Sequence, residues 1–447
     1  MTPDNQPKKS RLLVTREGVS YVLPFLVVTC CFALWGFAND ITNPMVKAFS
    51  KIFRMSVTDG TLVQVAFYGG YFCMALPAAM FIRRHSFKSG ILMGLALYAI
   101  GVLLFIPSRS IGSFAPFLVA YFILTCGLSF LETTANPYIL NMGDPETATR
   151  RLNLAQAFNP IGSLAGMFVA MNFIQARLSP LDTAQRATLD DTSFEALKQS
   201  DLAVLIQPYA LLGVVLIVLL LLMWFVPIPA VRQAARERHE PLWPAVKRLW
   251  TNKVYRNGVV AQFFYVGAQI TCWTFIIQYG TRVFMAEGMP EQAAEVLSQR
   301  YNIVAMVLFC LMRFVNIYLM KFFKPGRLMA FFAVVALALL CGVVFIGGRT
   351  GMCCLVAVSA CMSLMFPTIY GLALGGVRDD TEVGSAGLIM AILGGSLLPA
   401  VQAMIIDSGL QVIPAVNASF VVPAICFVVV MLYGMRSERL GIKQKID

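Results

Sequence analysis

The run Phe130-Leu-Glu-Thr-Thr-Ala-Asn-Pro137 lies inside a stretch, residues 115–140, that is otherwise almost entirely apolar. A stretch of this length is sufficient for a membrane-spanning helix, which needs about 20 residues. Its only acid, Glu132, would then lie at membrane depth, where a charged side chain costs about 2.5–3.5 kcal/mol on insertion scales. An acid is rarely kept there without a use, so Glu132 is the first candidate functional residue.

The rest of the chain has the same apolar character. Of its 447 residues, 58% are hydrophobic and 13% are charged, whereas soluble domains carry about 25% charged residues. Windows of about 20 residues predict an all-α integral membrane protein with twelve transmembrane helices, at 22–47, 61–82, 88–107, 115–140, 152–175, 204–227, 256–280, 300–322, 327–346, 352–375, 383–406 and 414–434. Asp40 and Arg313 join Glu132 as charged residues within these windows.

The net charge of +12 reflects topology and not nucleic-acid binding. With both termini placed in the cytoplasm and sides alternated from there, the cytoplasmic segments hold 24 of the 35 Lys and Arg residues and the opposite side holds 10. Cytoplasmic loops of membrane proteins carry this excess of positive charge. We therefore expect a multi-pass protein whose termini are both cytoplasmic.

The longest cytoplasmic gap divides the helices six and six. Within it, Leu242, Trp243, Leu249 and Trp250 recur at helical spacing beside basic residues, which is typical of an interfacial amphipathic helix; an ordinary solvated linker is the alternative. The expected organisation is a tail at 1–21, an N-terminal six-helix bundle at 22–227, a basic linker at 228–255, a C-terminal six-helix bundle at 256–434 and a tail at 435–447.

The two bundles are similar in sequence at matching turns. Phe87-Lys-Ser-Gly-Ile-Leu-Met93 shares five of seven positions with Phe323-Lys-Pro-Gly-Arg-Leu-Met329. Such repeats favour two pseudo-symmetric bundles that rock about a central site. Glycines in the fifth and eleventh helices would permit close helix contact, and four prolines are expected to break the fourth, fifth, tenth and eleventh helices: Pro137, Pro160, Pro367 and Pro399.

Four segments carry a resemblance to a known family: Phe32-Ala-Leu-Trp-Gly-Phe-Ala-Asn39, Leu131-Glu-Thr-Thr-Ala-Asn-Pro137, Arg151-Leu-Asn-Leu-Ala-Gln-Ala-Phe-Asn159 and Tyr265-Val-Gly-Ala-Gln-Ile-Thr-Cys-Trp273. Through them the chain resembles the L-fucose permease-like sugar/proton symporters, that is, the fucose–galactose–glucose/proton symporter family of the major facilitator superfamily. The resemblance extends over essentially the whole chain. It implies the major facilitator fold, the cell inner membrane, alternating access and sugar uptake driven by protons.

The resemblance also implies roles for individual residues. Glu132 matches a cavity glutamate that affects sugar binding and coupling, and Gln156 matches a sugar-contacting position. The family places Asn where this chain has Asp40, and its proton-carrying Asp where this chain has Asn43. Because positions i and i+3 share a helix face, we expect Asp40 to be the proton carrier beside Glu132 and Asn43 to contact the sugar. A purely structural Asp40 is the alternative.

Further candidate substrate ligands are amides and tryptophans, because amides offer both donors and acceptors to sugar hydroxyls and tryptophans offer flat apolar faces. They are Asn159, in a polar stripe with Asn153 and Gln156, and Gln262, Gln269, Trp273 and Trp35. Core packing is the alternative for each. Arg313 needs a partner at membrane depth, either an acid, a helix end or the sugar. Arg83 and Arg84 occupy the place of a cytoplasmic gate motif.

These features favour a proton-coupled importer of a neutral monosaccharide, working as a monomer in the lipid bilayer. An uncoupled or sodium-coupled facilitator and a membrane sugar sensor are the alternatives. An enzyme is not expected, because no catalytic triad, metal set or phosphate-binding loop appears. With only two His, we expect neither a metal nor a cofactor. Fucose, galactose, glucose and mannose all stay open, since epimers differ in the placement of one hydroxyl.

Overall fold

The computed structural model describes residues 12–13, 20–42, 45–55, 62–179, 181, 185–186, 188–226, 242–377, 380–407 and 414–443. Among them are twelve helical stretches that are long and apolar enough to cross a membrane. This confirms the predicted all-helical, multi-pass architecture and the predicted number of spans.

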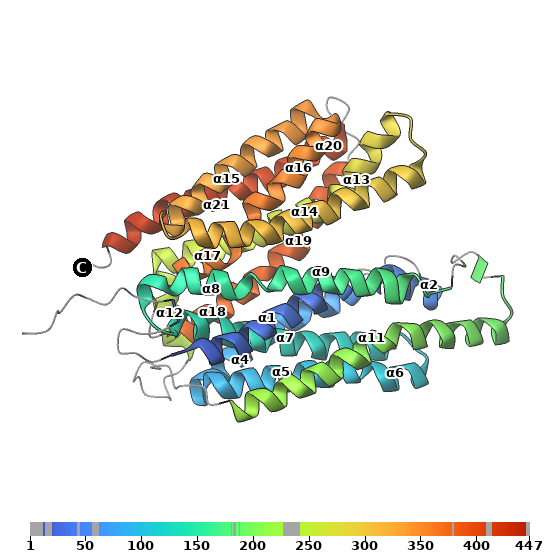
Figure 1. The fold of residues 1–447 in the computed structure, drawn as a ribbon, viewed down its shortest axis with the longest axis horizontal. Coiled ribbons are helices and arrows are strands. Elements are labelled where there is room, and N and C mark those ends of the chain that lie inside the picture. The colour runs from blue at the N-terminus through green and yellow to red at the C-terminus, as the bar shows by residue number, and fades with distance from the viewer. Residues whose placement is uncertain are drawn as a thin grey trace, which may run out of the picture. The chain divides into compact units, whose positions relative to one another are not determined.

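Figure 1 labels most of the helices of the chain. The first half contains α1 (Val22–Thr42), α2 (Met45–Ile52), α4 (Leu62–Arg84), α5 (Phe87–Leu103), α6 (Phe105–Ile111), α7 (Ala115–Asn141), η1 (Pro145–Thr147), α8 (Ala148–Gln156), α9 (Asn159–Val169), η2 (Ala170–Gln175) and α11 (Asp191–Phe225). The second half contains α12 (Leu242–Thr251), α13 (Lys253–Ala286), α14 (Glu291–Leu319), α15 (Pro325–Cys341), η3 (Gly342–Ile346), α16 (Gly348–Met362), α17 (Met365–Leu374), α18 (Thr381–Met390), η5 (Ala391–Leu393), α19 (Gly394–Asp407), α20 (Ala415–Ser419) and α21 (Val421–Lys443).

Some helices are longer than their apolar windows. Helix α11 begins at Asp191 and has 35 residues, whereas the hydrophobic window covers only 204–227. Asp190 caps its start, because the side chain accepts a hydrogen bond from the Ser193 N–H at 3.1 Å. At 1.5 Å per residue the helix is about 52 Å long, well beyond the roughly 30 Å hydrocarbon core. Hydropathy does not detect this polar extension, although the extension is helical.

The four prolines differ in their effects. Helix breaks lie just before Pro160, between α8 and α9, and just before Pro367, between α16 and α17. Pro137 and Pro399 instead lie inside the continuous helices α7 and α19. The prediction that all four break their helices is therefore wrong for these two. A proline removes one backbone hydrogen bond, and a packed membrane helix can survive that loss.

The chain forms two compact units. Unit 1 comprises residues 1–29, 136–157 and 229–447, and unit 2 comprises residues 30–135 and 158–228. Each unit is a group of residues that are in contact mainly with one another. The division into an N-terminal and a C-terminal six-helix bundle stays a prediction.

In unit 2, α1 and α9 are in close contact through glycines. A Cβ atom on Gly162 would lie 1.8 Å from the Ala33 carbonyl oxygen, and one on Gly36 would lie 2.0 Å from the Asn159 carbonyl oxygen. Only glycine fits at such distances, as expected for small residues at membrane helix contacts. This contact fixes Trp35 of α1 and Asn159 of α9 relative to one another.

In unit 1, α13 packs against α14, α17, α19 and α21. Helices α15, α16 and α21 lie together in the same unit (Figure 1). Helix α8 packs against α14 and α17, where Gly371 of α17 closely approaches Thr149 of α8. Helix α8 is therefore held by α17 and by α14, the helix that carries Arg313.

Helix α12 is bound to the rest of unit 1 by an ion pair. The Nε and Nη2 atoms of Arg248 donate to the two carboxylate oxygens of Asp380, at 2.8 and 2.7 Å. Leu249 is buried beside this pair, whereas Trp243 and Trp250 are exposed. The helix thus has one face against the protein and two exposed tryptophans.

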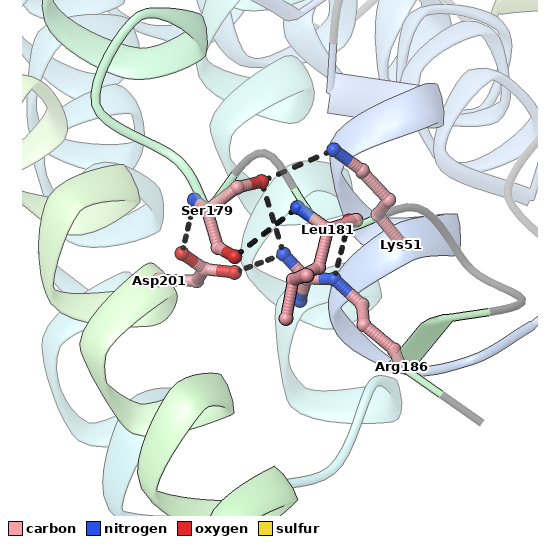
Figure 2. A network of polar contacts seen from close by, with 5 residues as sticks. All are labelled: Lys51, Ser179, Leu181, Arg186 and Asp201. Atoms are coloured by element: carbon pink, nitrogen blue, oxygen red, sulfur yellow. Dashed lines mark hydrogen bonds and ion pairs between the residues drawn. The ribbon is translucent and has the colours of Figure 1, made fainter. Parts of the chain in front are cut away.

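A second ion pair lies in unit 2, in the segment between η2 and α11 (Figure 2). Arg186 donates to an Asp201 carboxylate oxygen at 2.6 Å, and both side chains are almost fully buried. The other Asp201 oxygen accepts from the Ser179 N–H at 3.0 Å. Lys51 of α2 donates to the Ser179 carbonyl at 3.1 Å. The network therefore joins α2, this segment and α11.

We predict that Asp201→Asn destabilises the protein strongly. Removing one partner of a buried ion pair costs about 3–5 kcal/mol, because the remaining charge, here that of Arg186, stays buried without compensation. The measurement is thermal unfolding of the purified protein in detergent. Glu195→Gln is the matched control on the same helix, since Glu195 pairs with Lys198 at 2.6 Å on a more exposed surface and such pairs contribute about 1 kcal/mol or less. Equal unfolding temperatures for the two variants would contradict the prediction.

Candidate functional site

Glu132 is a buried acid of α7 in unit 2. Its side chain is 1% exposed, and neither carboxyl oxygen has a hydrogen-bond partner among the described residues. The Tyr71 hydroxyl of α4 has none either, and it lies near enough to interact electrostatically with Glu132. Burying an unpaired ionised carboxylate is very costly. A group in this position can therefore hold a proton and release it when its surroundings change.

Asp40 lies near the end of α1, also in unit 2, and is only partly buried. It interacts electrostatically with the hydroxyl of Tyr68 on α4. Asn43, which is expected to share a helix face with Asp40, lies outside the described residues. Asp40 and Glu132 thus differ in environment, since Asp40 is more accessible and Glu132 is enclosed.

Gln156 is the centre of a polar cluster in unit 1. It is 2% exposed, and its Nε2 donates to Asn136 Oδ1 at 2.8 Å. Its backbone carbonyl accepts a hydrogen bond from Arg313 Nη1 at 2.9 Å. The Arg313 guanidinium also lies over the Phe309 ring, 5.0 Å from its centroid. Of the three partners left open for Arg313, a helix end is the one observed here.

The polar stripe predicted for Asn153, Gln156 and Asn159 is wrong in part. The helix ends at Gln156 and restarts at Asn159, because Pro160 interrupts it. Asn153 donates to Thr368 Oγ1 of α17 at 3.3 Å, within unit 1. Asn159 instead donates to the Phe32 carbonyl of α1 at 3.3 Å, within unit 2. A single helical face therefore does not present all three amides.

The α13 residues do share a face, because the helix is continuous from Lys253 to Ala286 and positions i, i+7 and i+11 coincide in direction. Gln262 is fully buried, and neither side-chain polar atom has a hydrogen-bond partner among the described residues. Gln269 is partly exposed. Trp273 donates to Ser359 Oγ at 3.2 Å and meets the Phe309 ring edge-on at 5.0 Å. Phe309 thus contacts both Trp273 and Arg313.

The remaining candidate residues, Trp35, Arg83 and Arg84, belong to α1 and α4. Trp35 of α1 is partly exposed and lies 6.2 Å from the Phe32 ring, centroid to centroid. Arg83 and Arg84 are in the last turn of α4, where cations are favoured by the helix dipole. Lys88, which follows them, donates to the Trp224 and Val226 carbonyls at the end of α11, at 2.9 Å each.

Sequence reasoning assigned no role to two polar residues of unit 1. Asn136, within the quoted Glu132–Pro137 run, is buried and has an unpartnered Nδ2 in the described structure. Asn316 of α14 donates to Ser363 Oγ at 2.7 Å, and its Oδ1 has no partner among the described residues. Asn136 could have been identified from the sequence because it lies in the motif that contains Glu132, and Asn316 because it lies one helical turn after Arg313.

In the part of the chain that the structure describes, no three His, Cys, Asp or Glu side chains are grouped to hold a metal ion. The polar groups described above are instead amides, a guanidinium, hydroxyls and single carboxyls. Such a set can bind a neutral hydroxylated molecule through hydrogen bonds and can move one proton.

Comparison with known proteins is consistent with this geometry. The sequence profile of the Major Facilitator Superfamily matches residues 28–401. A protein of Haemophilus influenzae named L-fucose-proton symporter is 47% identical over 433 residues, which cover 94% of this chain and 97% of that protein. A Brucella abortus protein named glucose/galactose transporter is 31% identical, covering 97% and 98%.

The fold is similar to that of a solved transporter. The crystal structure of FucP in the outward conformation, described as a major facilitator superfamily transporter, matches with a TM-score of 0.84 and 30% identity, covering 93% of this chain and 99% of that chain. On the combined evidence of the sequence profile, the close relatives and this structure, the chain belongs to the major facilitator superfamily.

Proposed function

We propose that this protein is a proton-coupled secondary transporter that imports a neutral monosaccharide, L-fucose or a related hexose, by alternating access. The observation that carries the proposal is the enclosed carboxyl of Glu132, which has no hydrogen-bond partner within 3.5 Å among the described residues, in a chain 47% identical to an L-fucose-proton symporter. A buried acid of this kind supports a proton-carrying role. The glucose/galactose transporter among the relatives supports keeping the substrate class broader than fucose.

We assign the protein to the cell inner membrane as a monomer surrounded by lipid, with both termini in the cytoplasm. The distribution of basic residues supports this orientation. In this assignment, residues 22–227 and 256–434 are the two bundles that rock about the site, and residues 228–255 are the cytoplasmic linker. Arg83 and Arg84 would lie on the cytoplasmic side and act in gating there.

We assign proton coupling to Glu132 and Asp40. In the substrate site, Gln156, Asn159, Gln262 and Gln269 would donate to and accept from sugar hydroxyls, together with Asn43, which lies outside the described residues. Trp35 and Trp273 would cover the apolar face of the ring. The amide of Gln262 supports this role, because it has no hydrogen-bond partner among the described residues and a buried polar group without a partner is costly unless a ligand or water completes it.

Proton coupling is energetically sufficient for accumulation. One charge moving across a membrane potential of about 100 mV releases about 2.3 kcal/mol. Because about 1.4 kcal/mol corresponds to a tenfold ratio, one proton per sugar supports roughly fifty-fold accumulation at that potential.

Uptake of labelled sugars into proteoliposomes tests the proposed function. Fucose, galactose, glucose and mannose are each offered with an imposed proton gradient, with an imposed sodium gradient and with neither. Accumulation of one hexose only under the proton gradient supports the symporter. Equilibration without accumulation would indicate an uncoupled facilitator, and binding without uptake would indicate a sensor.

We predict that Glu132→Gln abolishes sugar accumulation and leaves a folded protein. Glutamine has nearly the shape of a protonated glutamate but has no proton to exchange, so net coupled transport stops. Counterflow needs binding and alternation but no net proton movement, so part of it is expected to continue. Wild-type accumulation driven by a pH gradient in this variant would refute the role of Glu132.

The assignment of Asp40 is tested by exchanging it with Asn43. We predict that Asp40→Asn uncouples transport, because an amide cannot titrate, and that Asn43→Ala weakens sugar binding but keeps some dependence on pH. The exchange Asp40→Asn with Asn43→Asp should restore accumulation, since it rebuilds the order of acid and amide found in the family. Normal coupling in Asp40→Asn would assign the proton to Glu132 alone and make Asp40 structural.

For the substrate site we predict that Gln156→Ala and Gln269→Ala each weaken sugar binding about tenfold, which corresponds to losing one hydrogen bond in a desolvated site. Isothermal titration calorimetry with the transported sugar measures this. Gln402→Ala is the matched control, because the Gln402 amide is buried in α19 and donates to Ser419 at 3.0 Å. Unchanged affinity in both site variants would favour a packing role for these glutamines.

A further inference from the structure

At the break between α8 and α9, the backbone carbonyl of Gln156 lacks its helical partner. In a continuous helix the carbonyl of Gln156 would accept from the N–H of residue 160. That residue is proline, which has no N–H. The chain turns tightly here, with the Ala157 N–H donating to the Leu154 carbonyl at 3.2 Å. Within a membrane-spanning segment, an unpartnered carbonyl would cost several kcal/mol.

Arg313 supplies the missing donor. Its Nη1 lies 2.9 Å from the Gln156 carbonyl oxygen, although the two residues are far apart in the sequence. Arg313 is 5% exposed, and its guanidinium lies over the ring of Phe309, one turn earlier on α14. None of the ion pairs within the described part of unit 1 includes Arg313. The observed use of this buried cation is thus to cap the broken helix.

The same residue, Gln156, is held a second time through its side chain. Its Nε2 donates to Asn136 Oδ1 at 2.8 Å. Asn136 belongs to the end of α7, and Arg151 of α8 donates to the Ile139 and Leu140 carbonyls of that end, at 2.8 Å each. The end of α7 and helix α8 therefore form one connected piece. Arg313 is the contact that holds the last residue of this piece against α14.

We propose that Arg313 is a positioning residue that replaces the helix hydrogen bond removed by Pro160 and thereby fixes the Gln156 amide for substrate. This inference rests on the proposed sugar-binding function. Arg313 is assigned no contact with the sugar and no part in proton transfer. Its effect on substrate is exerted through the backbone of Gln156.

A double-mutant cycle tests the proposal, because Pro160→Ala returns an N–H at residue 160, the position from which a continuous helix would donate to the Gln156 carbonyl. The variants are Arg313→Met, Pro160→Ala and the combination of the two, with Arg313→Lys as the conservative variant that keeps a charged donor. Sugar affinity by calorimetry, KM and maximal rate in counterflow, and the thermal unfolding temperature are measured for each variant.

We expect Arg313→Met to raise KM about tenfold with the maximal rate within about threefold of the wild type, which a general loss of structure would not produce. Arg313→Lys should stay within about threefold of the wild-type KM. In the Pro160→Ala background, Arg313→Met should change KM by less than about threefold, since the carbonyl then has another donor. The unfolding temperatures should show the same rescue.

Two outcomes would overturn the inference. One is an unchanged KM in Arg313→Met. The other is an effect of Arg313→Met that is equally large with and without Pro160, in both KM and unfolding temperature. If Arg313→Met does not fold alone, recovery of folding in the combined variant supports the cap, and failure to recover counts against it. Absence of sugar binding by the wild type would instead reject the proposed function, and the unfolding cycle would still decide the role of Arg313.

Discussion

Backbone groups inside a bilayer must find their partners within the protein, and the break in the fifth span is where this constraint acts most visibly. Pro160 removes the donor that the Gln156 carbonyl would use, and Arg313 of α14 supplies another at 2.9 Å. Because the side chain of the same glutamine is bound to Asn136, one backbone requirement connects α7, α8 and α14. The polar cluster of unit 1 is arranged around this connection.

Most of the fold could be predicted because apolar length is a local property. Windows of about 20 residues predict twelve spans, and the described residues contain twelve helical stretches long and apolar enough to cross a membrane. The ends of the helices were less predictable, since the first third of α11 is polar and still helical. The positions of the prolines alone did not predict the helix breaks. Pro137 lies inside a continuous helix, whereas a helix breaks just before Pro160, because tertiary packing decides whether a helix continues past a proline.

The sequence was sufficient to predict which polar residues are buried, but not which groups they contact. Glu132, Gln156, Gln262 and Arg313 were chosen because polar groups are expensive at membrane depth, and all four are buried in the structure. Their partners depend on helices distant in the sequence, so no local pattern could have identified the Gln156 carbonyl as the partner of Arg313. The three-amide stripe failed because helical periodicity holds only while the helix is continuous.

The placement of charge follows from the need to carry a neutral molecule. Arg248 in the last turn of α12 pairs with Asp380 at the start of α18, and Arg186 of a connecting segment pairs with Asp201 in the polar first third of α11. At membrane depth, the Arg313 guanidinium is bound to a carbonyl and a ring, which leaves its charge spread over neutral groups. Glu132 takes part in none of the ion pairs of the described residues, so its charge can change without breaking one of them. In the proposed mechanism the charges of these ion pairs stay fixed, and the two acids assigned to coupling, Glu132 and Asp40, respond to proton and substrate.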